Sequence, residues 1–235
     1  LSAPAYTVSN NVGGTLALLE AAKRHDGLQR FLLQSSEEVY GYCPRLPIRE
    51  DTPLNPTNPY GASKGAQEMI ARAYQHSCGV PVTIIRSGTL FGEGMRRTQV
   101  IPIFLEQALR GKPLTIHGDG SQTRDFHWVD DHVGVMLTAL SAPQAAGQTF
   151  NVGSGEERSV LSVAEECIRV TSSGSAMNFL PQRPGEQGLR VVLDSTRARE
   201  ILGYRPRVSF TEGLERMCAW LKKDLNMEKV LASHR

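Results

Sequence analysis

The feature that most constrains the fold is a short apolar strand that directly follows a long helix. Residues 80–86, with the sequence VPVTIIR, are apolar on both faces and rich in β-branched residues, which is typical of a parallel-sheet strand covered by helices. The preceding helix is expected over residues 59–77. Asn58 can cap its free amides, Pro59 suits its first position and Gly79 can end it. Together these segments predict an α/β fold.

An αβ step precedes this unit, and shorter elements follow it. A buried strand is expected over residues 31–33, after a helix over residues 12–23. The apolar face of that helix would consist of Val12, Leu16, Leu19 and Ala22. Beyond residue 92 the expected elements are helices over residues 101–109, 131–140, 195–202 and 211–225, a helix from about residue 162, strands over residues 114–117, 124–129 and 149–152, and a loop over residues 171–174. Ser209 and Glu212 have the spacing of a capping box for the last helix.

Charge and cysteine content argue against several classes of partner. Lys and Arg number 26 against 24 Asp and Glu, so no overall field should attract nucleic acid or an anionic membrane. The 4 cysteines are isolated, without a CxxC pair or a histidine cluster at metal spacing, which argues against a metal site. No apolar stretch approaches the roughly 20 residues of a membrane span, and the N-terminus lacks the pattern of a signal peptide. We therefore expect a cytoplasmic protein without nucleic-acid or membrane partners.

Tyr60 and Lys64 form the strongest chemical signal. They are four residues apart on the expected helix, so the phenol and the ammonium point to the same side. A nearby cation favours tyrosinate and lowers a pKa that is about 10 in free tyrosine, which suits a general base. Ser36 follows a strand, where active sites of open α/β sheets form, and would hydrogen-bond the reacting oxygen. A Tyr-x-x-x-Lys pair alone is common on helix surfaces, and only these flanking features give it weight.

At these residues the chain resembles the extended short-chain dehydrogenase/reductases that act on nucleotide sugars. That family includes UDP-glucose 4-epimerase, dTDP-glucose 4,6-dehydratase and UDP-glucuronate decarboxylase. The resemblance spans nearly the whole chain, with motifs in family order at residues 10–15, 35–41, 58–64, 86–92, 118–120, 124–126, 129–131, 151–153 and 183–185.

The resemblance implies NAD as the cofactor and assigns roles to the residues that match. Tyr60 would take the proton from the sugar 4-hydroxyl while hydride passes from C4 to NAD. Lys64 would also hold the nicotinamide ribose, and Ser36 would assist Tyr60. Asn11 and Ser35 are the further cofactor-binding positions that it implies.

The resemblance also implies a nucleoside-diphosphate sugar as the substrate. Arg124 resembles the family arginine that grips the diphosphate, and its guanidinium fork suits phosphate oxygens. A surface salt bridge with Asp125 is the alternative for this arginine. The remaining implied substrate contacts are Thr89, Val100, Ile101, Arg183 and Glu186. Thr89 stands where many members have Asn, and the Arg-Pro-Gly after residue 182 could also be an ordinary turn.

In fold class, the resemblance implies a Rossmann-like, doubly wound parallel sheet with a smaller C-terminal α+β substrate domain. Residues 1–92 would be the C-terminal part of the dinucleotide-binding domain, residues 93–225 mainly the nucleotide-sugar domain with some segments returning to the sheet, and residues 226–235 a frayed tail. Family members carry on the order of 80 further residues, with the glycine fingerprint, ahead of residue 10. We expect those N-terminal βα units to be missing here. Residues 118–120 and 153–155 would be turns and not replacements for the fingerprint.

Glu37 and Glu38 discriminate best within the family. The 4,6-dehydratases have Asp-Glu there, an acid for the departing 6-hydroxyl followed by a base for the C5 proton. Two adjacent carboxylates raise the pKa of one of them, as an acid paired with a base requires. We therefore expect 4,6-dehydration ahead of 4-epimerisation, with decarboxylation open. The alternative to a catalytic role is that Glu37 and Glu38 are two solvated acids on a loop.

Two further expectations concern association and a rival class. In the family, the helix with Tyr60 and the helix before it pack against their copies in a second subunit, which implies a homodimer through helices around Leu16 and Met69. The rival is a non-catalytic fragment that binds nucleotide sugar or dimerises. His117, His127 and His132 have no constellation around them in the sequence, so core or surface positions are expected.

Overall fold

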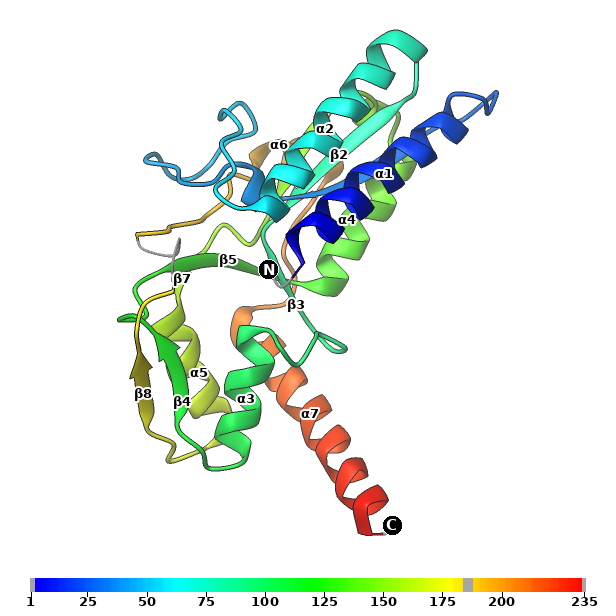
Figure 1. Cartoon of the computed structure of the whole chain (residues 1–235). Coiled ribbons are helices and arrows are strands. Elements are labelled where there is room, and N and C mark those ends of the chain that lie inside the picture. The colour runs from blue at the N-terminus through cyan, green and yellow to red at the C-terminus, as the bar shows by residue number, and fades with distance from the viewer. Residues whose placement is uncertain (1–2, 184–187, 234–235) are drawn as a thin grey trace.

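A three-stranded parallel sheet organises the upper part of the molecule in Figure 1. The computed structural model describes residues 3–183 and 188–233, with side chains through residue 225. The strand order in this sheet is β1 (Phe31–Ser36), β2 (Val82–Ser87) and β6 (Thr149–Val152). The predicted α/β class with a parallel sheet is therefore confirmed.

Helices cover both faces of this sheet. Successive side chains of a strand point to opposite faces, so Leu33 and Ile84 pack on one side and Leu32 and Ile85 on the other. The first side is covered by α1 (Pro4–Ala22) and α2 (Pro59–Cys78), which run side by side in Figure 1. The second side is covered by α4 (Val129–Ser141) and α6 (Thr196–Leu202).

Helix α1 differs from the prediction in its start and in its buried face. It begins at Pro4, about two turns before residue 12, with proline in the first turn, where the missing N–H costs nothing. Its buried residues are Thr15 and Leu19, whereas Leu16 is 42% exposed. The predicted apolar face was wrong at Leu16, because a small hydroxyl residue at position 15 occupies the side that packs on α2.

Helix α2 has the ends that the sequence predicts. The side chain of Asn58 accepts a hydrogen bond from the backbone N–H of Gly61 at 2.9 Å. Gly79 ends the helix in the left-handed conformation, with φ of 68°.

The lower part of the molecule has its own core. Its strands are β3 (Thr89–Phe91), β4 (Leu114–His117), β5 (Thr123–Trp128), β7 (Glu157–Ser159) and β8 (Met177–Leu180), in the pairings β3–β5–β7 and β4–β8. Its helices are α3 (Val100–Leu109), α5 (Val160–Thr171) and α7 (Phe210–Ser233). The sequence missed β3, β7 and β8, because runs of three or four residues, mostly exposed in β8, show no period.

The last helix is longer than predicted. The hydroxyl of Ser209 accepts from the N–H of Glu212 at 3.2 Å, as the capping-box spacing indicates. Helix α7 then continues to Ser233, so the tail predicted from residue 226 was wrong. No proline or glycine follows residue 225 to stop the helix.

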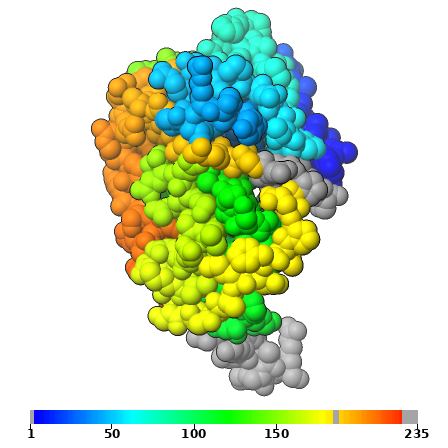
Figure 2. Space-filling model, turned by 90° about the vertical axis from the view of Figure 1, so that its left-hand side faces the viewer, coloured from blue at the N-terminus to red at the C-terminus, as the bar shows by residue number. Residues whose placement is uncertain are grey.

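Two 3-10 turns and one long loop complete the fold. The turns are η1 (Glu37–Val39) and η2 (Pro143–Ala145). Figure 2 shows the loop between η1 and α2 seated on the segment that follows residue 188, where Ile48 forms a β-bridge with Leu193. Among the described residues, no helix is long and apolar enough to cross a membrane.

Candidate active site

Ser36, Tyr60 and Lys64 meet at the carboxyl end of β1. The hydroxyl of Ser36 lies close enough to that of Tyr60 to lower the pKa of Tyr60. Lys64 lies one turn further along α2, with Nζ 5.9 Å from the centre of the Tyr60 ring, and donates to the carbonyl oxygen of Gln34 at 2.8 Å. Three polar groups are therefore gathered at the strand end, the usual place for the active site of an open α/β sheet.

The pKa of Tyr60 departs from the sequence prediction. The spacing predicts that Lys64 lowers it, whereas burial raises it above its usual value, and the charges of Glu38 and Glu37 add to the rise. The hydrogen bond with Ser36 and the charge of Arg96 act in the opposite direction. The prediction was wrong because it weighed the cation without the loss of water around a largely buried phenol.

The first turn of α2 lies directly against η1. A Cβ on Gly61 would overlap the carbonyl oxygen of Glu38, so glycine is needed for this approach. Asn58 joins the same two segments, because its side-chain oxygen caps the helix while its amide nitrogen donates to the Glu38 carboxylate. The sequence predicts the cap but not the contact with Glu38. Both contacts fix Tyr60 and Glu38 relative to each other.

Glu37 has quite different surroundings from Glu38. It is 6% exposed, and the hydroxyl of Thr89 donates to its Oε1 at 2.9 Å. Burial raises the pKa of Glu37 to about 8, Arg124 opposes this rise, and Asp125 adds to it. One of the two adjacent acids thus has a raised pKa, as predicted, but burial is the main cause and Glu38 only a minor one. Glu37 is therefore largely protonated at neutral pH.

The other two predicted cofactor residues have their side chains engaged elsewhere. The amide of Asn11 donates to Ser63 Oγ at 2.9 Å, which in turn donates to the carbonyl oxygen of Tyr60 at 2.7 Å. Ser35 points to the opposite face of the strand from Gln34 and donates to Glu68 at 2.6 Å. Asn11 thus joins α1 to the turn that carries Tyr60, while Ser35 belongs to the buried network behind the site.

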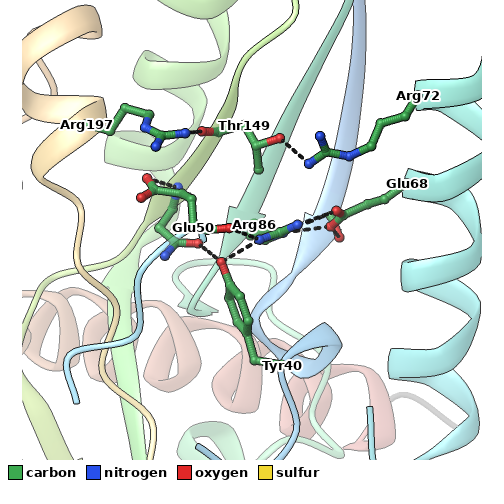
Figure 3. A network of polar contacts seen from close by, with 9 residues as sticks. Tyr40, Glu50, Glu68, Arg72, Arg86, Thr149 and Arg197 are labelled. Atoms are coloured by element: carbon green, nitrogen blue, oxygen red, sulfur yellow. Dashed lines mark hydrogen bonds and ion pairs between the residues drawn. The ribbon is translucent and has the colours of Figure 1, made fainter. Parts of the chain in front are cut away.

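That buried network is drawn in Figure 3. The guanidinium of Arg86 on β2 pairs with Glu68 on α2 at 2.6 Å and donates to the hydroxyl of Tyr40 at 2.7 Å. The Tyr40 hydroxyl donates to Asn151 on β6 at 2.6 Å. Glu68 is one turn beyond Lys64 on α2. The network therefore holds the side of α2 that carries Tyr60 and Lys64 against the strands.

The remaining predicted substrate residues lie in varied places. Val100 is half-buried at the start of α3 and packs on the lower core. Ile101 is fully buried in that core, so its side chain serves packing, and a sugar contact through it is not supported. Arg183 is exposed after β8, and Glu186 lies outside the described residues.

Both glycine-bearing segments are turns or bends, as predicted, and neither opens a long helix. The second one wraps an internal carboxylate. The N–H groups of Ser154 and Gly155 donate to Asp125 at 2.7 and 3.2 Å, and the N–H of Leu193 donates at 3.0 Å. Asp125 is fully buried, so the alternative of a surface salt bridge between it and Arg124 is wrong.

Three polar residues outside the predicted site form a chain beneath the strand end. Gln34 Oε1 lies 2.8 Å from His132 Nε2, and His132 Nδ1 lies 3.2 Å from His127 Nε2. The two histidines are buried, which confirms the core positions expected for them, and they have polar partners that the sequence did not indicate. They lie on β5 and α4, and only folding brings them to Gln34.

Within the described part of the chain, no group of three or more His, Cys, Asp and Glu is placed to hold a metal ion.

The fold and the gathered polar groups define a Rossmann-like enzyme of the short-chain dehydrogenase/reductase type. Residues 1–217 match the family described as GDP-mannose 4,6 dehydratase, and the chain belongs to that family. It is 35% identical over 216 residues to a dTDP-glucose 4,6-dehydratase of an Actinoplanes species, covering 92% of this chain and 67% of that protein. The chain spans about two thirds of the length of the curated relatives that it matches.

Solved structures of two activities are similar to this chain. One is UDP-glucuronic acid 4-epimerase from Bacillus cereus with UDP-glucuronic acid and NAD, with a TM-score of 0.86 and 34% identity over 92% of this chain and 68% of that one. The other is dTDP-glucose 4,6-dehydratase from Streptomyces venezuelae with NAD, with a TM-score of 0.89 and 31% identity over 96% of this chain and 70% of that one. An epimerase and a dehydratase are similar to the same degree, so the site itself must distinguish the reactions.

Proposed function

We propose that the protein catalyses NAD-dependent 4,6-dehydration of a nucleoside-diphosphate sugar. One observation carries this proposal. A hydroxyl pair, Ser36 and Tyr60, lies at the same strand end as two carboxyl groups in opposite settings, with Glu37 buried and Glu38 held by an amide donor. Epimerisation at C4 needs the first pair but has no use for an acid and a base at C6 and C5.

Two of the predicted cofactor residues fit NAD well. When bound, NAD would supply the hydride chemistry, as acceptor of the C4 hydride and as its donor to C6 after water has left. An ammonium has three N–H donors, and Lys64 directs one to the carbonyl of Gln34, so the others suit ribose hydroxyls. Tyr60 would bind the same ribose. The side chains of Asn11 and Ser35 already donate within the protein and fit less well.

The acid–base work falls to four side chains. Tyr60 would take the proton of the sugar 4-hydroxyl, with its tyrosinate stabilised by Ser36. Oxidation at C4 acidifies the C5 proton, which Glu38 would take. Glu37 would give its proton to the 6-oxygen as the C6–O bond breaks, and water leaves. Thr89, which donates to Glu37, and Arg124, whose charge acts on Glu37, would contact the substrate beside it.

The test uses the full-length polypeptide with NAD and UDP- or dTDP-glucose, with products identified by NMR. We expect a 4-keto-6-deoxy sugar. Tyr60→Phe should abolish the first oxidation and leave sugar-nucleotide binding intact. Glu38→Gln should leave NADH bound and slow deuterium entry at C5 by about 10²–10⁴-fold. The exposed Glu165→Gln on α5 is the matched control. Interconversion of C4 epimers at the wild-type rate in Glu38→Gln, without any keto-deoxy product, would favour the epimerase.

We also propose a homodimer through α1 and α2. These helices lie side by side, and Tyr6 and Met69 on them are 71% and 63% exposed. Two-fold dimers are the commonest oligomers and would bury such apolar side chains. Sedimentation that finds an active monomer at micromolar concentration would contradict this.

The division into two domains at residue 92 and the cytoplasmic location stay proposals as well.

A further inference from the structure

Two buried polar atoms beside Gly88 lack a hydrogen-bond partner among the described residues. They are Oε2 of Glu37 and Nδ1 of His127, and His127 is 2% exposed. A Cβ on Gly88 would lie 3.3 Å from the first atom and 3.4 Å from the second. Both atoms therefore lie close to the bare side of Gly88, where a side chain would also overlap the carbonyl oxygen of Asp125. Buried polar atoms rarely stay unpaired, so the two atoms need an explanation.

The hydrogen bonds around the histidines fix where their protons sit. The amide nitrogen of Gln34 donates to the carbonyl oxygen of Ser35 at 2.8 Å and to Ser87 Oγ at 2.9 Å, so its Oε1 is the acceptor that faces His132. His132 Nε2 must then carry a hydrogen. In a neutral imidazole the other nitrogen accepts, so Nδ1 of His132 receives the Nε2–H of His127. The remaining nitrogen of His127, Nδ1, is an unprotonated acceptor.

Both imidazoles are neutral near pH 7. Burial lowers the pKa of His132 to about 4. Burial, followed by the neighbouring His132, lowers the pKa of His127 well below its usual value. These shifts agree with the proton positions that the hydrogen bonds require.

Glu37 presents the complementary group. Thr89 donates to its Oε1, so the proton of the neutral carboxyl sits on Oε2, the atom that lies beside Gly88. The charged groups that act on this carboxyl are Arg124 and Asp125 from β5 and Glu38 from η1. A donor on Glu37 and an acceptor on His127 thus both lie beside Gly88.

We propose that His127 is a positioning residue that accepts a hydrogen bond from the protonated carboxyl of Glu37, after a small rotation of that carboxyl or through one water. This bond keeps the proton on Glu37 until the carboxyl turns it from His127 to the departing 6-oxygen. His132 and Gln34 hold the imidazole in the tautomer that can accept. Glu38 has the opposite partner, the amide donor of Asn58, which suits a carboxylate that acts as a base. The inference rests on the proposed function, because the acid is needed only where a 6-hydroxyl departs.

Nitrogen-15 NMR of the imidazole side chains tests the pairing without any turnover. At pH 7 we expect His127 and His132 to be neutral, each with its proton on Nε2. Replacing Glu37 by Leu should shift the Nδ1 resonance of His127 and leave that of the exposed His76 unchanged. A charged imidazolium, a proton on Nδ1 of His127, or no shift in Glu37→Leu would overturn the proposal.

Two substitutions of His127 separate its two nitrogens. In His127→Asn the side-chain oxygen can take the place of Nδ1, whereas in His127→Gln the amide takes the place of Nε2 and the acceptor is lost. The infrared C=O stretch of the protonated carboxyl, assigned with Glu37→Gln, gives the midpoint of Glu37 deprotonation. We expect His127→Gln to lower that midpoint by about one pH unit, since one ordinary hydrogen bond is lost. The protonated fraction of Glu37, and with it kcat, should then fall about twofold at pH 7 and about tenfold well above pH 8, with KM nearly unchanged. His127→Asn should restore both.

The same measurements separate this proposal from the proposed function. If the imidazole and infrared signals behave as expected while no 4-keto-6-deoxy sugar forms, the proposed function fails, and the proton-sharing pair stands without its use in dehydration. If dehydration proceeds while His127→Gln and His127→Asn both leave the Glu37 midpoint at the wild-type value, the pair is refuted and the proposed function stands.

Discussion

The two faces of strands β1 and β2 bury polar groups in opposite ways. Side chains alternate along each strand, so neighbouring residues point to different helices. The charged face, toward α2, consists of Ser35, Tyr40, Glu68 and Arg86. The neutral face, toward α4, consists of Gln34, Ser87, His127 and His132.

The difference follows from what each side chain can do with its proton. Arginine cannot give up its proton in a protein, so a buried Arg86 needs the Glu68 carboxylate beside it. Burial alone would lower the pKa of Arg86, and the hydrogen bonds and charge of Glu68 and Tyr40 raise it instead. Histidine can lose its charge, and burial drives His132 to do so. The charged face is held together by opposite charges. The neutral face is held together by hydrogen bonds of neutral imidazoles, whose tautomers place a donor opposite each acceptor.

The largest expected loss of stability comes from a substitution on the charged face. Arg86→Met leaves Glu68 buried without its counter-ion, which should lower the free energy of unfolding by about 3–5 kcal/mol. The double variant Glu68→Leu/Arg86→Met removes both charges and should recover most of that loss. Urea unfolding followed by circular dichroism measures both. A cost below about 1 kcal/mol for Arg86→Met would mean that water reaches Glu68 and that the face is not closed.

A pH series examines the end of the neutral face, where Glu37 lies beside His127. The pKa of Glu37 in the folded protein, about 8, exceeds the ordinary 4.5. Its contribution to stability is therefore fully present below pH 4.5 and is lost as the pH rises toward 8. Over that range, wild type should lose stability relative to Glu37→Gln by up to about 1.4 kcal/mol per pH unit. Equal pH dependence in wild type, Glu37→Gln and the exposed control Glu165→Gln would show that Glu37 is ionised throughout.

The smallest expected effect is a matched pair of serine substitutions, one on each face. Ser35 donates to the carboxylate of Glu68 at 2.6 Å, whereas Ser87 accepts from the neutral amide of Gln34 at 2.9 Å. Hydrogen bonds to charged groups contribute about 1.5–3 kcal/mol and neutral ones about 0.5–1.5 kcal/mol. Ser35→Ala should therefore lower the unfolding free energy more than Ser87→Ala. A larger loss for Ser87→Ala than for Ser35→Ala would show that charge does not distinguish the two faces.

Local signals allowed much of the fold to be predicted. Asn58, Pro59 and Gly79 fixed the ends of α2, because caps and left-handed glycines act within one helical turn. The apolar run after Gly79 indicated a strand covered on both sides, and β2 is buried along its whole length. Short or exposed strands such as β8 escaped, since three or four residues carry too little pattern.

At the candidate site, the sequence by itself determined which groups are available and which of them share an element. Tyr60 and Lys64 face one way because they are four residues apart on a helix, and Ser36 lies at a strand end because the strand stops there. Only the tertiary structure decided which carboxyl is protonated and which histidine nitrogen is free. Glu37 and Glu38 are adjacent and chemically identical, and they differ because β3 and β5 bury the first while Asn58 holds the second. Burial and charge are set by contacts between distant segments, and no spacing along the chain encodes them.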